Sequence, residues 1–404
     1  MADVASVIAE TVRRERGPIL GGLLRLSGSI DAAEEAFQEA ALSALEAWRD
    51  GAPENPGAWL MTAAKNRAKD ARRHHAIARA KAPLLAEDDV DEGENIDTVT
   101  DDYLRLIFTC CHPALAVDNQ IALTLKVVCG FSTEEIARTF MCSEATVSQR
   151  ILRAKQGIEG VKAAYAIPER RELDARVLAV LGVVYAMFNE GHIGRTGPLM
   201  RLNLQAEALR LGRLLCDLLP REPEAFGLFA LMAFNAARAS TRVDSDGNAI
   251  LLSEQNRSQW DKELLREGLM ARERARTLGG RGTYVLQAEI AAVHATAPTW
   301  ESTDWAAIVT FYDALDTVAP SPIVKMNRAI AISMHRGPKA GLDALKEVAR
   351  DLEGYHLFYA TRADLLERAG KDPERDLEKA LELATNDAER RLLRDRLARI
   401  GTRH

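Results

Sequence analysis

The sequence predicts an all-α protein, and three observations support that class. Aromatic residues make up only 5% of the 404 residues, so the residue types that favour β-strands are scarce. Alanine, leucine, arginine and glutamate, which favour helices, dominate instead. The sequence also lacks alternating β-branched runs bounded by turn residues. Its length is enough for two or three domains.

Charge and composition limit the classes of function. The formal net charge is −6, which excludes a general polyanion binder and requires local basic patches for any contact with nucleic acid. No apolar stretch approaches the roughly 20 residues that span a bilayer, and the first residues lack the apolar core of a signal peptide. We therefore expect a cytoplasmic protein that makes no contact with a membrane.

The five cysteines predict reduced thiols rather than a metal centre. Their number is odd, and their spacing matches no metal-binding pattern. We expect them to pack as small hydrophobic side chains, with no bound metal or cofactor. Zinc held by Cys110, Cys111 and His112 is the alternative, although adjacent residues make a poor chelate.

Four segments follow one another along the chain. Residues 1–80 read as a helical domain that ends in a basic run. Residues 81–100 are rich in aspartate and glutamate and poor in apolar residues, which is typical of a solvated linker. Residues 101–165 read as a second helical unit, and residues 166–404 carry helical patterns interrupted by proline and glycine.

An acidic helix is predicted from Asp31 to Trp48, with Asp31 as its N-cap. At 100° per residue, its apolar face consists of Phe37, Ala41, Ala44, Leu45 and Trp48. Its opposite face carries Asp31, Glu35, Glu39 and Glu46. Such a face is either simply solvated or a docking surface for a basic helical partner, where complementary charge sets the register.

A basic helix follows, and it begins at Pro56, a residue suited to the first helical position. Its predicted buried side consists of Leu60, Met61, Ala64, Ala68 and Ala71. Its other side carries Trp59, Thr62, Asn66, Lys69 and Arg73, with Lys65, Arg67 and Arg72 at the margins. The excess of cations indicates phosphate contact, and Trp59 and Asn66 offer single-stranded bases a stacking surface and hydrogen bonds. A merely solvated basic face is the alternative.

Residues 130–156 predict a helix-turn-helix. Ser132 and Glu135 form a capping box for its first helix, and Ser143 caps the second. Val147, Ile151 and Ala154 are predicted to face inward, whereas the outer face and its edges carry Glu144, Ala145, Thr146, Gln149, Arg150 and Arg153. The second helix of such a pair enters the major groove. Glutamine, arginine and threonine read base edges there, while Lys155 and Arg150 contact phosphate; a structural helix pair is the alternative.

The C-terminal block shows repetition near the tetratricopeptide period. Ala329 and Ala363 lie 34 residues apart, and Gly337 and Gly370 lie 33 apart. Helix pairs with this period stack into a solenoid that has a concave binding surface. We therefore predict a helical-repeat, tetratricopeptide-like domain.

Two polar segments of this block do not read as plain repeat. One places Asn189, Glu190 and His192 at the end of an apolar helix, and the other contains Arg242, Asp244, Arg257 and Trp260. Each is interpreted either as a ligand pocket or as a hydrogen-bonded joint between helices. Calcium at Asp244 is disfavoured, because the glutamate that closes an EF-hand loop is missing.

In order, these blocks resemble the two DNA-binding domains of extracytoplasmic-function (ECF) RNA polymerase sigma factors. The segments DAAEEAFQEA (31–40) and PGAWLMTAAKNRAKDARR (56–73) are similar to sigma region two, and residues 130–156 are similar to region four. The polar C-terminal segments resemble those of the subgroup that carries a tetratricopeptide-like domain.

The resemblance implies roles for particular residues. Docking on the coiled coil of the polymerase β′ subunit would fall to Asp31, Glu35, Gln38 and Glu39. The helix from Trp59 to Arg73 would capture the minus-ten element. The second helix of the helix-turn-helix would read the minus-thirty-five element, and region four would also contact the β flap.

We therefore expect a non-enzymatic sigma factor that binds core RNA polymerase and promoter DNA. Its C-terminal domain would regulate the sigma domains in cis through an intramolecular contact. A helix-turn-helix regulator with a ligand-sensing helical domain is the alternative, but it leaves the acidic and basic helices unexplained. An enzyme that uses Glu190 and His192 as an acid–base pair is a third hypothesis, and no second constellation supports it.

Overall fold

The computed structural model describes residues 4–49, 51–79, 96–140, 142–159, 170–192, 198–242, 250–384 and 387–401. Within these ranges the regular structure is entirely helical, which confirms the predicted all-α class. The chain forms two compact units, residues 1–208 and 209–404. No described helix is both long and apolar enough to cross a membrane. Most of the predicted acidic linker, residues 81–95, lies outside the described residues.

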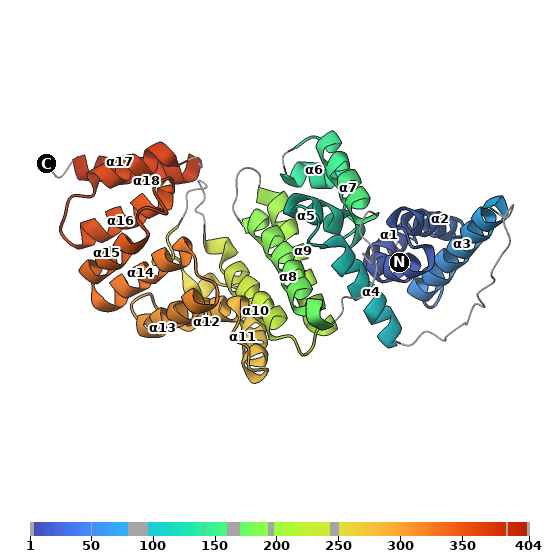
Figure 1. Ribbon diagram of the computed structural model, residues 1–404, viewed down its shortest axis with the longest axis horizontal. Helices are drawn as coiled ribbons and strands as arrows, with labels where there is room; N and C mark the ends of the chain where they lie inside the picture. The colour runs from blue at the N-terminus through green and yellow to red at the C-terminus, as the bar shows by residue number, and fades with distance from the viewer. Residues whose placement is uncertain are drawn as a thin grey trace. The chain divides into compact units, whose positions relative to one another are not determined.

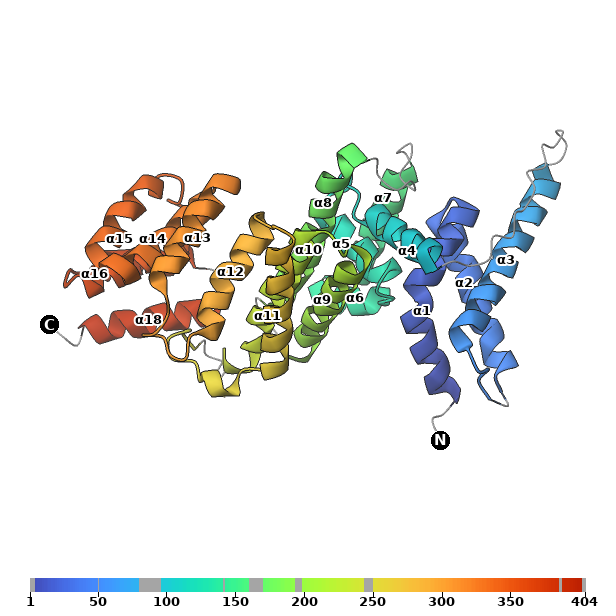
Figure 2. The same cartoon turned by 90° about the horizontal axis from the view of Figure 1, so that it is seen from below.

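The first unit begins with three helices packed against one another: α1 (Val4–Ser27), α2 (Ile30–Ala47) and α3 (Pro56–Arg79). Figures 1 and 2 show them side by side. The expected start of α3 at Pro56 is confirmed. The expected N-cap of α2 is wrong by two positions, because the extended residue before the helix is Ser29 rather than Asp31. Asp31 therefore lies inside the first turn, where its negative charge interacts favourably with the positive end of the helix dipole.

Two predicted apolar faces differ from the structure at their edges. The buried stripe of α2 consists of Ile30, Ala33, Ala36, Phe37, Ala40 and Ala44. Leu45 is 50% exposed, because it is turned about 100° from Ala44, away from the side that is packed. In α3, Leu60, Ala64 and Ala68 are buried and Met61 is half-buried. Ala71 is exposed, since the carboxyl half of α3 runs past the end of α2 (Figure 2).

Five further helices complete the first unit before α9. They are α4 (Ile96–Cys110), α5 (Val117–Val127), α6 (Thr133–Phe140), α7 (Glu144–Glu159) and α8 (Arg170–His192). The capping box is confirmed, because Glu135 N donates to Ser132 Oγ (3.0 Å) and Ser132 N donates to Glu135 Oε2 (2.7 Å). The cap of α7 is confirmed too, since Thr146 N donates to Ser143 Oγ (3.2 Å). These caps start α6 and α7, the two helices of the predicted helix-turn-helix.

Helix α8 packs on α4 and α5. Its buried Arg176 donates Nη2 to the carbonyl of Phe108 (2.9 Å) and lies over the Phe108 ring, 5.9 Å from the centroid. A buried guanidinium needs such partners, so this bond ties α8 to the end of α4. Helix α8, which starts the predicted C-terminal block, therefore packs against helices of the preceding block, residues 101–165.

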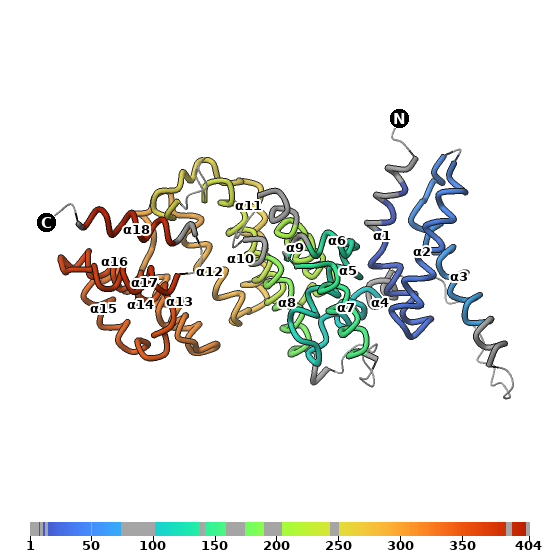
Figure 3. The backbone as a smooth tube through the Cα atoms, turned by 90° about the horizontal axis from the view of Figure 1, so that it is seen from above, coloured from blue at the N-terminus to red at the C-terminus, as the bar shows by residue number. Residues whose placement is uncertain are grey.

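The second unit is a succession of helices. Helix α9 (Pro198–Leu218) begins in the first unit and ends in the second. The helices that follow it are α10 (Pro223–Ala237), α11 (Lys262–Thr277), α12 (Thr283–Thr296), α13 (Trp305–Val318), α14 (Pro322–Arg336), α15 (Pro338–Leu345), α16 (His356–Arg368), α17 (Glu374–Leu383) and α18 (Asp387–Gly401). From α10 onward each helix contacts the next, as Figure 3 shows for α13 to α16. Nearest-neighbour packing of this kind is typical of helical repeats.

The residues that carried the predicted period occupy equivalent places. Gly337 (φ +90°) follows α14 and Gly370 (φ +69°) follows α16, and positive φ ends a helix at little cost only in glycine. Ala329 in α14 and Ala363 in α16 are both fully buried. The sequence period therefore corresponds to the successive pairs α14–α15 and α16–α17, while tetratricopeptide identity stays a prediction.

Candidate nucleic-acid interface

Helix α7 presents the polar face that the sequence predicts. Val147, Ile151 and Ala154 are buried. Glu144, Ala145, Thr146, Gln149 and Arg153 are exposed, and Arg150 and Lys155 are half-buried. Arg150 Nη2 lies 3.2 Å from Asp118 Oδ2 of α5, whose side chain is 67% exposed, so this ion pair contributes little to stability. The face is accessible and polar, which base reading in a groove requires.

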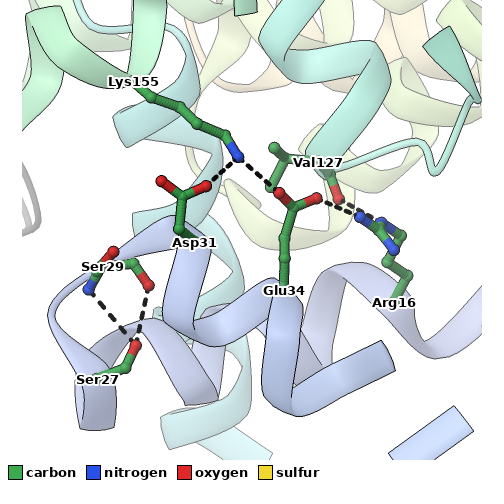
Figure 4. Close-up of polar contacts among 7 residues, drawn as sticks. All are labelled: Arg16, Ser27, Ser29, Asp31, Glu34, Val127 and Lys155. Atoms are coloured by element: carbon green, nitrogen blue, oxygen red, sulfur yellow. Dashed lines mark hydrogen bonds and ion pairs between the residues drawn. The ribbon is translucent and has the colours of Figure 1, made fainter. Parts of the chain in front are cut away.

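Lys155 is engaged within the protein. Its Nζ lies 2.5 Å from Asp31 Oδ1 and 2.8 Å from Glu34 Oε2 of α2 (Figure 4), and its side chain is only 15% exposed. Burial lowers the pKa of Lys155, but the hydrogen bonds and charges of Asp31 and Glu34 outweigh it, so the pKa lies above its ordinary value. The ammonium is therefore charged and held by carboxylates rather than open to phosphate.

A second cation shares Glu34. Arg16 Nη2 lies 2.5 Å from Glu34 Oε1, and Arg16 Nε donates to the carbonyl of Val127 (3.2 Å) (Figure 4). Burial lowers the pKa of Arg16, and the neighbouring Glu34 partly restores it. We call the four side chains Arg16, Asp31, Glu34 and Lys155 the α2–α7 clasp. Two cations and two carboxylates balance there, so the largely buried charges are paired.

The turn before α2 positions the clasp. Gly28 has a φ of +66°, a conformation that glycine adopts readily. Ser27 Oγ lies 3.0 Å from the carbonyl oxygen of Ser29 and 3.4 Å from its nitrogen (Figure 4). This turn starts α2 at Ile30 and places Asp31 and Glu34 on consecutive turns of one helix face.

The acidic residues predicted to dock a partner are exposed. Asp31, Glu35, Gln38 and Glu39 are all exposed on α2, but Asp31 belongs to the clasp. Glu39 Oε2 lies 3.8 Å from Arg67 Nε, both side chains being about half exposed, and Arg67 also donates to Ser43 Oγ (3.3 Å). The structure thus brings a predicted docking residue and a predicted minus-ten residue together, in a pair too solvated to contribute much stability.

The basic face of α3 is accessible, with one difference from the prediction. Thr62, Asn66, Arg67, Arg72 and Arg73 are exposed, whereas Trp59, Lys65 and Lys69 are half-buried. Trp59 was expected on the outward side, but its ring packs edge-on against Trp48 with centroids 5.4 Å apart. This contact extends the apolar cluster around Ile8 and Ala44. Only part of the Trp59 ring therefore remains for stacking on a base.

The cysteines are packed as the sequence predicts. Cys110, Cys111, Cys129 and Cys216 are buried and Cys142 is half-buried, all as free thiols. Burial raises the pKa of Cys111 to about 12 and raises that of Cys110 well above its ordinary value. Cys111 Sγ lies 3.5 Å from Thr124 Oγ1, and His112 Nδ1 accepts from Ala114 N (3.1 Å). The thiols of Cys110 and Cys111 therefore stay protonated, which is unfavourable for metal ligation there.

The two polar C-terminal segments are placed only in part. Asn189 lies in α8 and hydrogen-bonds Tyr185, while the side chains of Glu190 and His192, and all of Asp244, lie outside the described residues. In the second unit, the Arg257 guanidinium lies over the Trp260 ring, 4.9 Å from its centroid.

The polar neighbours of Arg257 were not all found from the sequence. Trp260 Nε1 donates to Thr241 Oγ1 (3.0 Å), next to Arg242. Arg238 and His294 lie in the same neighbourhood, because the charges of Arg238 and Arg257 both act on His294. One feature of the sequence points to this region: three of the five tryptophans, Trp260, Trp300 and Trp305, fall within it.

Comparison with known protein families gives matches for the α1–α3 helices and for the helix-turn-helix. Residues 11–77, which include α2 and most of α3, match the sigma-70 region 2 family. Residues 105–156, which include the helix-turn-helix, match the sigma-70 region 4 family. Residues 176–276 match a family of unknown function (DUF6596). A search of solved structures found no match.

Curated relatives agree with these matches. An uncharacterized protein of Rhizobium meliloti is 39% identical over 393 residues, which are 95% of this chain and 93% of that protein. The ECF RNA polymerase sigma-E factor of Haemophilus influenzae is 34% identical over 116 residues, or 25% of this chain and 58% of that protein. That of Escherichia coli K12 is 30% identical over 147 residues, or 33% of this chain and 73% of that protein. The chain therefore belongs to the ECF RNA polymerase sigma factor family.

Proposed function

We propose that the chain binds core RNA polymerase and directs promoter-specific initiation of transcription. The observation that carries this proposal is the pair of accessible surfaces in family order: the acidic face of α2 beside the basic face of α3, and then the polar face of α7. Capture of unpaired bases and reading of groove edges are binding events, so the proposal needs no catalytic group.

Each surface has one proposed partner. The exposed carboxylates Glu35 and Glu39, with Asp31 and Gln38, suit the polymerase β′ coiled coil, where complementary charge sets the rate and register of docking. Asn66, Arg72 and Arg73 on α3 suit the melted minus-ten strand, with Trp59 as a partial stacking surface. The α7 face suits the minus-thirty-five duplex, and the rest of that domain the β flap.

The clasp couples these surfaces. Asp31 Oδ1 accepts from Lys155, so a basic group of the polymerase that takes the place of Lys155 there would compete with one arm of the clasp. Docking at Asp31 would then leave Lys155 held by Glu34 alone, which weakens its tie to α2 and favours contact with promoter phosphate. Binding of the polymerase and binding of duplex DNA would therefore both favour an arrangement in which Lys155 of α7 no longer contacts α2.

The C-terminal domain is proposed to regulate initiation in cis. The packing of α8 on α4 and α5, anchored by Arg176, supports a route from that domain to the helix-turn-helix. A chain ending at His192 keeps α8 in place and loses the rest of the domain. Its transcriptional output should differ from that of the full chain, and an equal output would contradict cis regulation.

Co-elution with core polymerase tests the main proposal. The double variant Glu35→Lys/Glu39→Lys should lose co-elution, because it reverses two exposed charges on the docking face. The matched variant Arg72→Ala/Arg73→Ala should co-elute normally but fail to open promoter DNA. A chain that never co-elutes with core polymerase and binds duplex DNA alone would instead be a conventional helix-turn-helix regulator.

A further inference from the structure

Several cations of the second unit come together beside α12. Arg238 ends α10, Arg242 follows a short 3-10 turn, Arg257 begins another, and His294 lies in α12. We call these four residues the Arg238 cluster. All four side chains are half-buried, so they are partly desolvated but still within reach of solvent. Nothing in the family matches assigns them a role.

The cations of this cluster act on one another. Burial, and then the charges of Arg242 and Arg257, lower the pKa of Arg238 to about 10. Burial, and then the charges of Arg238 and Arg257, lower the pKa of His294 to about 4. His294 is therefore neutral at pH 7, and the like charges of Arg242 and Arg257 disfavour the charged form of Arg238.

Neither Arg238 nor Arg257 makes an ion pair with a carboxylate in the described part of the chain, although the negative charge of Glu301 acts on Arg257. Arg238 Nη2 donates to the amide oxygen of Asn235 (3.3 Å). Arg257 Nη1 donates to the carbonyls of His294 and Ala297, the latter at 2.8 Å. Arg238 Nε, Arg257 Nη2 and His294 Nδ1 are buried atoms without a hydrogen-bond partner.

Two other half-buried arginines of the same unit are paired with carboxylates, whereas Arg390 donates to the carbonyls of Leu381 and Ala384. Arg272 lies 2.6 Å from the buried carboxylate of Glu289, and Arg362 lies 2.6 Å from that of Asp376. Buried cations are paired as a rule, because an unpaired one loses its hydration without compensation. Among the described residues no carboxylate makes an ion pair with Arg238 or Arg257, so an anion from outside the chain would supply the counter-charge.

The surrounding aromatic rings hold the cluster in place. Trp260, only 4% exposed, lies under the Arg257 guanidinium. Trp300 stacks on His294 (centroids 6.1 Å apart, planes 12° apart), and Trp305 meets the same ring edge-on at 5.2 Å. Rigid neighbours reduce the entropy that a ligand must overcome, so the donors are oriented before anything binds.

We propose that the Arg238 cluster is a binding site for a small oxyanion, either a phosphate or a carboxylate. Guanidinium groups recognise both through paired, charge-assisted N–H···O bonds. The half-buried guanidiniums of Arg238 and Arg257 supply donors of this kind, and their enclosed Nε and Nη2 atoms have no hydrogen-bond partner of their own. The site does not depend on the proposed transcriptional function, because it is carried by charges within the second unit alone.

Thermal denaturation and calorimetry of the full chain test this site. Inorganic phosphate and citrate are the two probes, titrated separately at constant ionic strength. At least one should raise the Tm by about 2 °C or more near saturation. A rise with phosphate alone identifies a phosphate site, a rise with citrate alone a carboxylate site, and a rise with both a general oxyanion site.

Arg238→Gln is the diagnostic variant, and Arg281→Gln, at an exposed arginine of the same unit, is its control for net charge. Arg238→Gln should weaken binding at least about tenfold, and its Tm without probe should not fall, because a repelled cation has been removed. Arg281→Gln should bind like the native chain. The proposal is overturned if neither probe binds, if Arg238→Gln binds normally, or if both variants weaken binding equally.

Discussion

The α2–α7 clasp and the Arg238 cluster both remove cations from water, yet they treat the charge in opposite ways. In the clasp, Lys155 and Arg16 share the carboxylates of Asp31 and Glu34, and the pKa of Lys155 is raised. In the cluster, amide and carbonyl oxygens are the partners of Arg238 and Arg257, and the pKa of Arg238 falls to about 10.

The difference separates a structural contact from a site that needs a ligand. Paired charges satisfy each other, so the clasp joins α2 to α7 without outside help. Unpaired charges leave donors available, so the cluster is stabilised by whatever anion reaches it. The arm of the clasp at Asp31 is nevertheless open to competition, because the Asp31 side chain is 64% exposed.

Removing the shared carboxylate of the clasp should have the largest effect. Glu34→Gln leaves Arg16 and Lys155 largely buried with one carboxylate fewer, so the free energy of unfolding should fall by about 3 kcal/mol. Urea denaturation of the full chain measures this change. Glu35→Gln, at the exposed neighbouring position, is the control and should change stability by less than about 0.5 kcal/mol. Equal effects of the two variants would mean that the clasp adds no stability.

Lowering the pH should reduce the stability of the folded chain, because His294 must then take up a proton within the Arg238 cluster. The pKa of His294 is about 4 in the folded chain and about 6.5 when unfolded. The unfolded chain therefore binds the extra proton first, and stability present above pH 6.5 is lost as the pH falls towards 4. The loss should reach about 3 kcal/mol at most. His294→Phe, which keeps an aromatic ring between Trp300 and Trp305, should flatten stability over this range; an unchanged pH profile would show that another group titrates there.

The smallest effect is expected at Asp31. Asp31→Asn removes one arm of the clasp, but Lys155 keeps Glu34, so the free energy of unfolding should fall by no more than about 1 kcal/mol. Thermal denaturation detects a change of this size. A loss as large as that of Glu34→Gln would show that Asp31, rather than Glu34, holds the clasp together.

Local features were predictable from the sequence, because their partners lie within one turn of helix. The capping box of Ser132 and Glu135, the cap at Ser143 and the inward face of α7 follow from spacing alone, and the structure has them as predicted. The predicted N-cap of α2 is wrong by two residues, and the predicted burial of Leu45 is wrong at the edge of the apolar face. Helical periodicity identifies an apolar face but does not show which edge of that face a neighbouring helix covers.

The two charge clusters could not be predicted, because they join distant residues. Glu34 and Lys155 are 121 residues apart, and nothing in either segment indicates the other. Arg242, Arg257 and Trp260 were singled out as polar exceptions to the repeat, but Arg238 ends an apolar helix and His294 lies in another. Only the packing of α10 against α12 brings them together.

Run-off transcription with purified core polymerase tests the central claim most directly. Fragments of genomic DNA serve as templates, with the core enzyme alone as the control. The account predicts discrete transcripts that start only when the chain is added, and that disappear with Glu35→Lys/Glu39→Lys. Transcripts that do not depend on the chain, or none from any fragment despite stable co-elution with core polymerase, would contradict the assignment of promoter-directed initiation.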